Sequence, residues 1–371
     1  MSATLLPEPL LTLLGSLGVL SLVLGLGYLA ATVRAGRLDR QRVDLLDEVG
    51  LLQTALLPEV PEVVGQVRTS VAYRPSDGPA AGGDFYDAMT LPDGRAAFIL
   101  GDVCGHGRQA LARTAFVRYT LRAYLEAGME PRSALQVAGT VIDDHMDGEF
   151  ATAVIAVHDP AQGTLTYASA GHPAPLVAGP ARPEAIVAAS SPPVGMGLRT
   201  GVRQTVLPLP PGSVVCLYTD GLAEARTERG VLGRPRLGDI LADMGRDATA
   251  AEMLDRVAAE ATLVSDDMAT MVLAPTAGVT TGRPRVEQLE VEAHEVDEGL
   301  ADRFLAACGI GPAEARAVIA DCRRVLQRHG SAVLVVTYGV AGPGAVAEAP
   351  LPAALPAAVP APSSPRLFSL L

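Results

Sequence analysis

Acidic residues recur at the edges of apolar segments in this chain. Asp84 follows two glycines in AAGGDFYD, Asp102 ends the apolar run AAFILGD, and Asp220 ends the run VVCLYTD and precedes a glycine. Asp266 and Asp267 stand directly before the apolar run MATMVLA. A helix cap or a turn explains any one of these acids well. It explains the set poorly, because an acid that only caps has no reason to recur at the edges of buried strands.

Carboxylates gathered at one end of a sheet would favour a metal site. They would repel each other and raise each other's pKa unless cations held them together. Mg²⁺ and Mn²⁺ prefer oxygen ligands and retain water, and neighbouring glycines would let backbone carbonyls and water approach. Two ions bridged by a shared carboxylate would generate a hydroxide at neutral pH and hold a phosphoryl group. The chemistry expected is therefore metal-assisted phosphoryl hydrolysis, provided that the acids meet in space.

The apolar pattern predicts the elements that would carry these acids. Groups of strands separated by groups of helices are typical of an α+β protein whose sheets are covered by helices. The expected strands lie at residues 67–73, 95–102, 150–158, 163–170, 213–220 and 268–274, and the expected helices at 108–127, 131–146 and 248–264.

The composition excludes several classes of protein. The chain has 371 residues and a formal net charge of −12, and it contains no lysine, so its 29 basic residues are all arginines. Enzymes that need a P-loop lysine, a kinase lysine or a Schiff-base lysine are therefore excluded. The acidic balance argues against nucleic acid as a partner. Four scattered cysteines favour neither a zinc site nor a disulfide framework.

Six motifs occur in an order that resembles one family. They are AGGDFYD, GDVCGHG, SAGHPAPLV, PPVGMG, LYTDGLAEA and DDMATMVL. Over about residues 50–275 the chain resembles the SpoIIE/RsbU-type serine phosphatases of the metal-dependent PPM (type 2C) group, and LLQTALLPEVPEV resembles the segment that leads into that domain. The resemblance implies an α+β fold with a PPM-type β-sandwich flanked by helical layers, and a two-metal site at one end of it.

The resemblance also implies a role for the motif residues. Asp84 resembles the ligand that bridges two Mn²⁺ or Mg²⁺ ions, Asp102 and the carbonyl of Val103 resemble ligands of the first ion, and Asp220 and Asp266 resemble ligands of the second. The implied reaction is in-line attack of metal-activated water on phosphorus, for which the four aspartates are catalytic. The supporting residues expected around them are Gly83, Gly105, His106, Gly221 and Asp267.

Two roles are open for His106 and two for the whole protein. His106 either donates a proton to the leaving serine oxygen or stabilises its turn. The protein is either a phosphoprotein serine/threonine phosphatase of bacterial signalling, with a STAS-like anti-sigma-factor antagonist as the implied substrate, or a pseudophosphatase scaffold that binds a regulator without turnover. A scaffold would be marked by the loss of a metal ligand, and all four aspartates are present.

The N-terminal region predicts a membrane anchor. Residues 10–33 carry no charge and are long enough to cross a bilayer as a helix. Arginines follow the run at positions 34, 37, 40 and 42, which predicts that the remainder of the chain lies in the cytoplasm. We therefore expect residues 1–33 to form an N-terminal transmembrane anchor and the protein to be a single-pass protein of the inner membrane.

The remaining boundaries follow from periodicity and composition. Residues 34–58 predict a linker helix whose heptad positions Leu45, Val49, Leu52 and Leu56 would pair two protomers into a homodimer. The phosphatase domain is expected at 59–276. Residues 285–338 predict a small strand–helix–helix–strand unit of unknown role, and the Pro/Ala-rich residues 339–371 predict a disordered tail.

Overall fold

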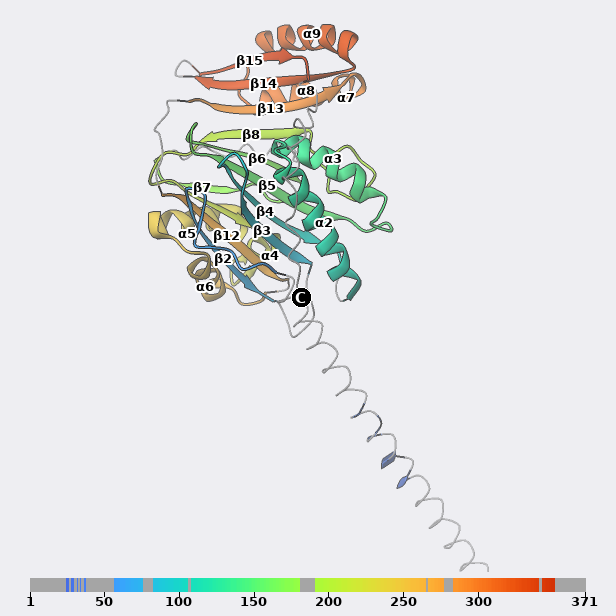
Figure 1. Ribbon diagram of the computed structural model, residues 1–371, viewed down its shortest axis with the longest axis vertical. Helices are drawn as coiled ribbons and strands as arrows, with labels where there is room; N and C mark the ends of the chain where they lie inside the picture. The colour runs from blue at the N-terminus through green and yellow to red at the C-terminus, as the bar shows by residue number, and fades with distance from the viewer. Residues whose placement is uncertain are drawn as a thin grey trace, which may run out of the picture.

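The computed structural model describes residues 57–75, 83–105, 108–180, 191–264, 266–276, 283–339 and 342–350, with a few single residues between 25 and 37 (Figure 1). Within these residues the chain forms two antiparallel sheets. The large sheet contains, in spatial order, β15 (Gly342–Glu348), β14 (Ser331–Gly339), β13 (Arg285–Glu292), β8 (Arg203–Pro208), β6 (Thr164–Ala170), β5 (Ala151–Asp159), β4 (Ala96–Val103) and β3 (Asp84–Thr90). The small sheet contains β1 (Val63–Val64), β2 (Val67–Arg74), β12 (Met268–Pro275), β9 (Val214–Tyr218) and β7 (Leu176–Ala178).

The helices follow the same chain order. They are α2 (Arg108–Glu126), α3 (Pro131–Asp143), α4 (Asp220–Glu224), α5 (Gly233–Met244), α6 (Ala250–Glu260), α7 (Ala293–Asp297), α8 (Leu300–Ala307) and α9 (Pro312–His329). A short 3-10 turn spans Gly245–Asp247, and β10 (Arg226–Thr227) pairs with β11 (Gly230–Val231) as a separate hairpin.

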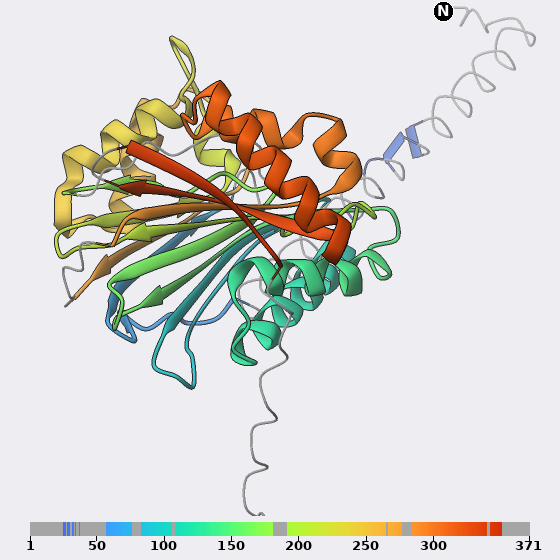
Figure 2. The same cartoon turned by 90° about the horizontal axis from the view of Figure 1, so that it is seen from above.

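The two sheets stack face to face and form the central core. Phe98 and Leu100 of β4 pack there against Leu217 of β9 and Met271 of β12. Helices α2 and α3 cover the other face of the large sheet, and α5 and α6 cover the other face of the small sheet (Figures 1 and 2). Strand β4 is buried on both faces, which explains why its sequence is a continuous apolar run rather than an alternating one. The predicted α+β sandwich between helical layers is confirmed.

The C-terminal residues extend the large sheet. Strand β13 pairs with β8 on one side and with β14 on the other. Glu287 of β13 lies opposite Thr205 of β8, which lies opposite Tyr167 of β6, so these side chains share the face that is turned toward the small sheet. Helices α7 to α9 pack on this same face, over Leu289 and Leu334. Strand β15, which lies within the tail that we expected to be disordered, forms the edge of the sheet.

The predicted membrane span is corrected by the structure. No helix among the described residues is both long and apolar enough to cross a membrane. An uncharged run meets the requirement of composition, but crossing also needs a continuous helix of about 20 residues. Most of residues 10–33 lie outside the described part of the chain. The prediction of an N-terminal anchor in a single-pass inner-membrane protein is therefore withdrawn. The heptad positions of the linker helix, with the predicted homodimer contact, also lie outside the described residues.

A histidine in the core between the sheets should make stability depend on pH. His158 of β5 is fully buried, and neither ring nitrogen has a hydrogen-bond partner among the described residues. Burial lowers the pKa of His158, against a smaller opposing effect of Asp159. The unfolded chain therefore binds the proton more tightly than the folded protein. The contribution of the neutral ring is complete above about pH 6.5 and is lost as the pH falls below that value.

Replacing this histidine with leucine should flatten that dependence. We expect His158→Leu to keep the wild-type free energy of unfolding at pH 7.5, because no hydrogen bond is lost. Its loss of stability between pH 6.5 and 5 should be smaller than that of the wild type by up to about 1.4 kcal/mol per pH unit. Urea unfolding at several pH values measures both quantities. The exposed His329 provides the control, since His329→Gln should not flatten the curve. Parallel curves for His158→Leu and the wild type would contradict the prediction.

Candidate metal centre

The first pair of acids comes from adjacent strands of the large sheet. Asp84 begins β3, and Asp102 lies directly opposite it on β4. Because side chains alternate along a strand, Asp102 shares the face of Leu100, which lies in the core between the sheets. Both carboxylates therefore project from one end of the large sheet toward the small sheet. Asp84 is buried, with 3% of its surface exposed.

The second group of acids comes from the small sheet. Strand β9 ends at Tyr218, and Asp220 is the first residue of α4. Asp266 and Asp267 lie in the segment that enters β12, the neighbour of β9. A Cβ on Gly221 would lie 2.0 Å from the carbonyl oxygen of Asp267, so only glycine permits this approach of α4 to the 266–267 segment.

Acids from the two sheets interact electrostatically. Burial raises the pKa of Asp84 well above its ordinary value, and Asp102, Asp267 and Asp266 raise it further. Burial, followed by repulsion from Asp220, Asp266 and Asp267, raises the pKa of Asp102 to about 7. Burial and then Asp266 also raise the pKa of Asp220. Acids from both sheets therefore lie near enough to one another to interact at this end of the sandwich.

The carboxylates are suitable ligands for divalent cations, but their side chains are not arranged to coordinate an ion. Among the described residues, no group of three or more His, Cys, Asp or Glu side chains is arranged so that it could hold an ion. The fit rests on the chemistry of the donors, because Mg²⁺ and Mn²⁺ prefer carboxylate oxygens and aspartates from both sheets lie near one another here.

Backbone geometry at two of the expected supporting glycines fits the same site. A Cβ on Gly83 would lie 1.9 Å from the carbonyl oxygen of Val103 and 2.4 Å from Oδ1 of Asp102, so the absence of a side chain keeps this corner open. The amide of Val103 donates to the carbonyl of Gly83 over 3.1 Å. Gly105 has a φ of 98°, a conformation that favours glycine. His106 lies outside the described residues, so both of its roles stay predictions.

Two hydroxyl groups at the site were not anticipated from the sequence. The buried Thr219 donates from Oγ1 to Oδ2 of Asp84 over 3.0 Å. Tyr73 of β2 donates from its hydroxyl to Oδ2 of Asp267 over 2.5 Å. Thr219 stands next to Asp220 in LYTDG, which was the one available signal. Tyr73 is distant in sequence from every acid, and only the pairing of β2 with β12 brings it close.

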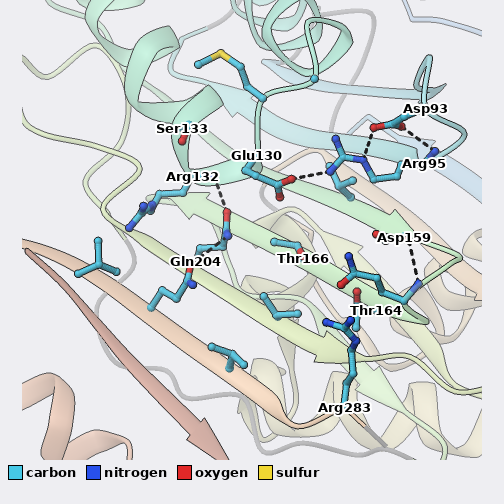
Figure 3. A pocket seen from close by; sticks show the side chains of 18 of the residues that line it. Asp93, Arg95, Glu130, Arg132, Ser133, Asp159, Thr164, Thr166, Gln204 and Arg283 are labelled. Carbon is cyan, nitrogen blue, oxygen red and sulfur yellow. Dashed lines mark hydrogen bonds and ion pairs between the residues drawn. The ribbon is translucent and has the colours of Figure 1, made fainter. Parts of the chain in front are cut away.

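A polar cleft of about 790 Å³ lies elsewhere on the large sheet (Figure 3). Its lining comes from the β3–β4 turn and the start of α3. It also includes the face of β5, β6, β8, β13 and β14 that points away from the small sheet. Arg95 in its wall is held by Asp93 and Glu130, each over 2.7 Å. None of the predicted metal ligands lines this cleft, so it is separate from the acidic site.

Comparison with known proteins identifies the domain. The SpoIIE family, described as stage II sporulation protein E, matches residues 92–275, which include Asp102, Asp220 and Asp266, while Asp84 lies just before them. Protein IcfG of Synechocystis is 27% identical over 188 residues, which are 43% of this chain and 30% of IcfG. Phosphoserine phosphatase RsbU of Bacillus subtilis is 28% identical over 144 residues, which are 38% of this chain and 43% of RsbU.

These matches cover less than half of the length of either curated relative. Among solved structures, the SiaA PP2C domain of Pseudomonas aeruginosa superposes with a TM-score of 0.53 at 22% identity, and the match covers 64% of this chain and 98% of that domain. At that identity the likeness concerns the fold. The family match shows that residues 92–275 belong to a SpoIIE-family phosphatase domain, and the shared fold is that of a PP2C domain.

Proposed function

We propose that this protein is a metal-dependent protein serine/threonine phosphatase of bacterial signalling. The observation that carries the proposal is the proximity of acids from two sheets, where burial and neighbouring acids raise the pKa of Asp84, Asp102 and Asp220. The name of the relative RsbU, a phosphoserine phosphatase, supports the substrate class. We further propose a phosphorylated anti-sigma-factor antagonist of the STAS type as the substrate.

Two Mg²⁺ or Mn²⁺ ions are proposed for the site. Asp84 would bridge them, Asp102 and the carbonyl of Val103 would hold the first, and Asp220 and Asp266 would hold the second. When bound, the ions would supply an activated water and neutralise charge on the phosphoryl group. We propose Asp267 as a supporting residue, since it is held by Tyr73 and its amide donates to Oδ1 of Asp266 over 2.8 Å.

The chain's own contribution is to bring the carboxylates together before the substrate arrives. The large sheet carries Asp84 and Asp102 on one face, and the small sheet carries Asp220 and Asp266 at its end. Gly83 lets its backbone lie against Val103, and Gly221 lets α4 lie against Asp267. A Cβ at either glycine would collide with the facing carbonyl oxygen. All four aspartates lie at, or within two residues of, the end of a strand, and such positions are more rigidly supported than free loops.

Removal of divalent ions tests this function directly. The full-length protein should hydrolyse a phosphoserine protein and p-nitrophenyl phosphate in Mn²⁺ or Mg²⁺. Excess EDTA should lower the rate on the order of 100-fold or more, and added Mn²⁺ should restore it. Full activity in EDTA would refute the two-ion proposal. Tight Mn²⁺ binding without turnover of any phosphoprotein would favour a scaffold over an enzyme.

A further inference from the structure

Thr219 joins the two halves of the proposed metal centre. It follows the last residue of β9 in the small sheet, and its side chain reaches Asp84 on β3 of the large sheet. We propose that Thr219 is a positioning residue that fixes the carboxylate of Asp84 for metal binding. This inference rests on the proposed function, because it assumes that Asp84 is a ligand.

The hydrogen bonds around the Thr219 hydroxyl determine its direction. The amide of Ala269 on β12 donates to Oγ1 of Thr219 over 2.9 Å. An amide can only donate, so Oγ1 accepts there, and its single proton is left for another acceptor. Oδ2 of Asp84 lies 3.0 Å away, whereas the carbonyl oxygen of Ala269 lies at 3.4 Å and already accepts the amide of Thr219 over 3.0 Å. The proton of the hydroxyl therefore points at Asp84.

Asp84 lies where a hydrogen bond from another element can affect the orientation of its carboxylate. Strand β3 is the edge strand of the large sheet, with a ladder partner on one side only. Its first residue is Asp84, so the ligand is at the end of an edge strand. The hydrogen bond from Thr219 reaches it from the opposite sheet and limits rotation of the carboxyl plane. Groups that orient a ligand in this way typically change metal affinity by about 10–100-fold when they are lost.

The chain provides a matched control in Thr270. It lies on β12 and, like Thr219, is fully buried. Its hydroxyl donates to the carbonyl of Leu217 over 3.0 Å and lies 3.1 Å from the sulfur of Cys216. Alternation along β12 places it on the face of Met268 and Val272, which pack toward α5 and α6. Thr270→Val therefore removes a buried hydroxyl of the same sheet away from Asp84.

Mn²⁺ affinity of the full-length protein tests the inference, measured as free Mn²⁺ by electron paramagnetic resonance. We expect Thr219→Val to weaken Mn²⁺ binding by about 10–100-fold. Thr219→Ser should restore affinity to within about threefold of the wild type, because serine keeps the donor. Thr270→Val should bind Mn²⁺ like the wild type. The Mn²⁺ concentration that gives half-maximal hydrolysis of p-nitrophenyl phosphate should shift in parallel for each variant.

Several outcomes would overturn the inference. A folded Thr219→Val with wild-type Mn²⁺ affinity would do so, and so would equal losses in Thr219→Val and Thr270→Val, which would indicate general damage to the sheet. If Thr219→Val does not fold, Thr219→Ala serves in its place. Asp84→Asn separates this inference from the proposed function. Unchanged Mn²⁺ affinity in Asp84→Asn would refute the ligand role itself, whereas loss there with none at Thr219 would refute only the positioning role.

Discussion

Replacing Asp84 with asparagine should lower kcat/KM for a phosphoserine substrate by about 10²–10³-fold in saturating Mn²⁺. Asparagine keeps the size of the side chain and an oxygen that can accept from Thr219, but it loses the charge that would bridge two cations. The same change should leave the metal-free protein at least as stable as the wild type, because burial and three neighbouring acids disfavour the ionised carboxylate. Loss of activity without loss of stability would show that Asp84 serves the site rather than the fold.

Steady-state kinetics and thermal unfolding in EDTA measure the two effects. Asp255 supplies the control, because it is an exposed acid of α6 that pairs with Arg74 on the surface. Asp255→Asn should retain wild-type kcat/KM. If Asp84→Asn retained more than about a tenth of wild-type activity, or if it unfolded at a much lower temperature in EDTA, the ligand role would not stand.

The strands beside two of the acids were predictable because a strong apolar pattern marks them. The run AAFILGD marks the strand of Asp102, and VVCLYTD marks the strand before Asp220. Strand β3 was not predicted, because DFYDAMT carries two acids. One of them, Asp87, is buried and pairs with Arg122 of α2 over 2.9 Å. The sequence alone does not show that a buried acid has a basic partner in another element, so such an acid is taken for a surface residue.

The pairing of the C-terminal strands with the rest of the large sheet was not predictable either. A strand was expected as the first element of residues 285–338, but the pairing of β13 with β8 depends on residues more than 80 positions earlier. Nothing in the local pattern states which strand lies beside β13. The division into domains at 276 and 285 stays a prediction, whereas the pairing of β13 with β8 shows that one continuous sheet runs across it.

Glu287 at this junction carries the second large effect that we expect. It is fully buried, and its Oε2 accepts from Arg203 over 3.1 Å and from Thr205 over 2.7 Å, both on β8. Its Oε1 accepts from Nε of Arg285 over 2.9 Å and from Nη2 over 2.6 Å. The two guanidinium groups lie over aromatic rings of the C-terminal residues, Arg203 over Phe304 and Arg285 over Tyr338.

Glu287→Ala should lower the free energy of unfolding by about 3–5 kcal/mol. The change removes the carboxylate that two arginines share, and the side chains of these arginines are only 10% and 11% exposed, so water replaces it poorly. Urea unfolding at pH 7.5 measures the loss. A change below about 1 kcal/mol would show that the arginines find other compensation, and would contradict the prediction.

Burial, rather than the pairing itself, should decide the size of this effect. Glu260 on α6 also accepts two hydrogen bonds from one guanidinium group, that of Arg236, but both side chains are more than one third exposed. Glu260→Ala should therefore leave the urea midpoint nearly unchanged, because water solvates a released surface arginine. Glu287→Gln should fall between Glu287→Ala and the wild type, since the amide keeps the shape and one acceptor but removes the charge. Equal losses of stability in Glu287→Ala and Glu260→Ala would contradict this expectation. They would mean that water reaches the contact between β13 and β8, and that buried ion pairs do not stabilise the large sheet there.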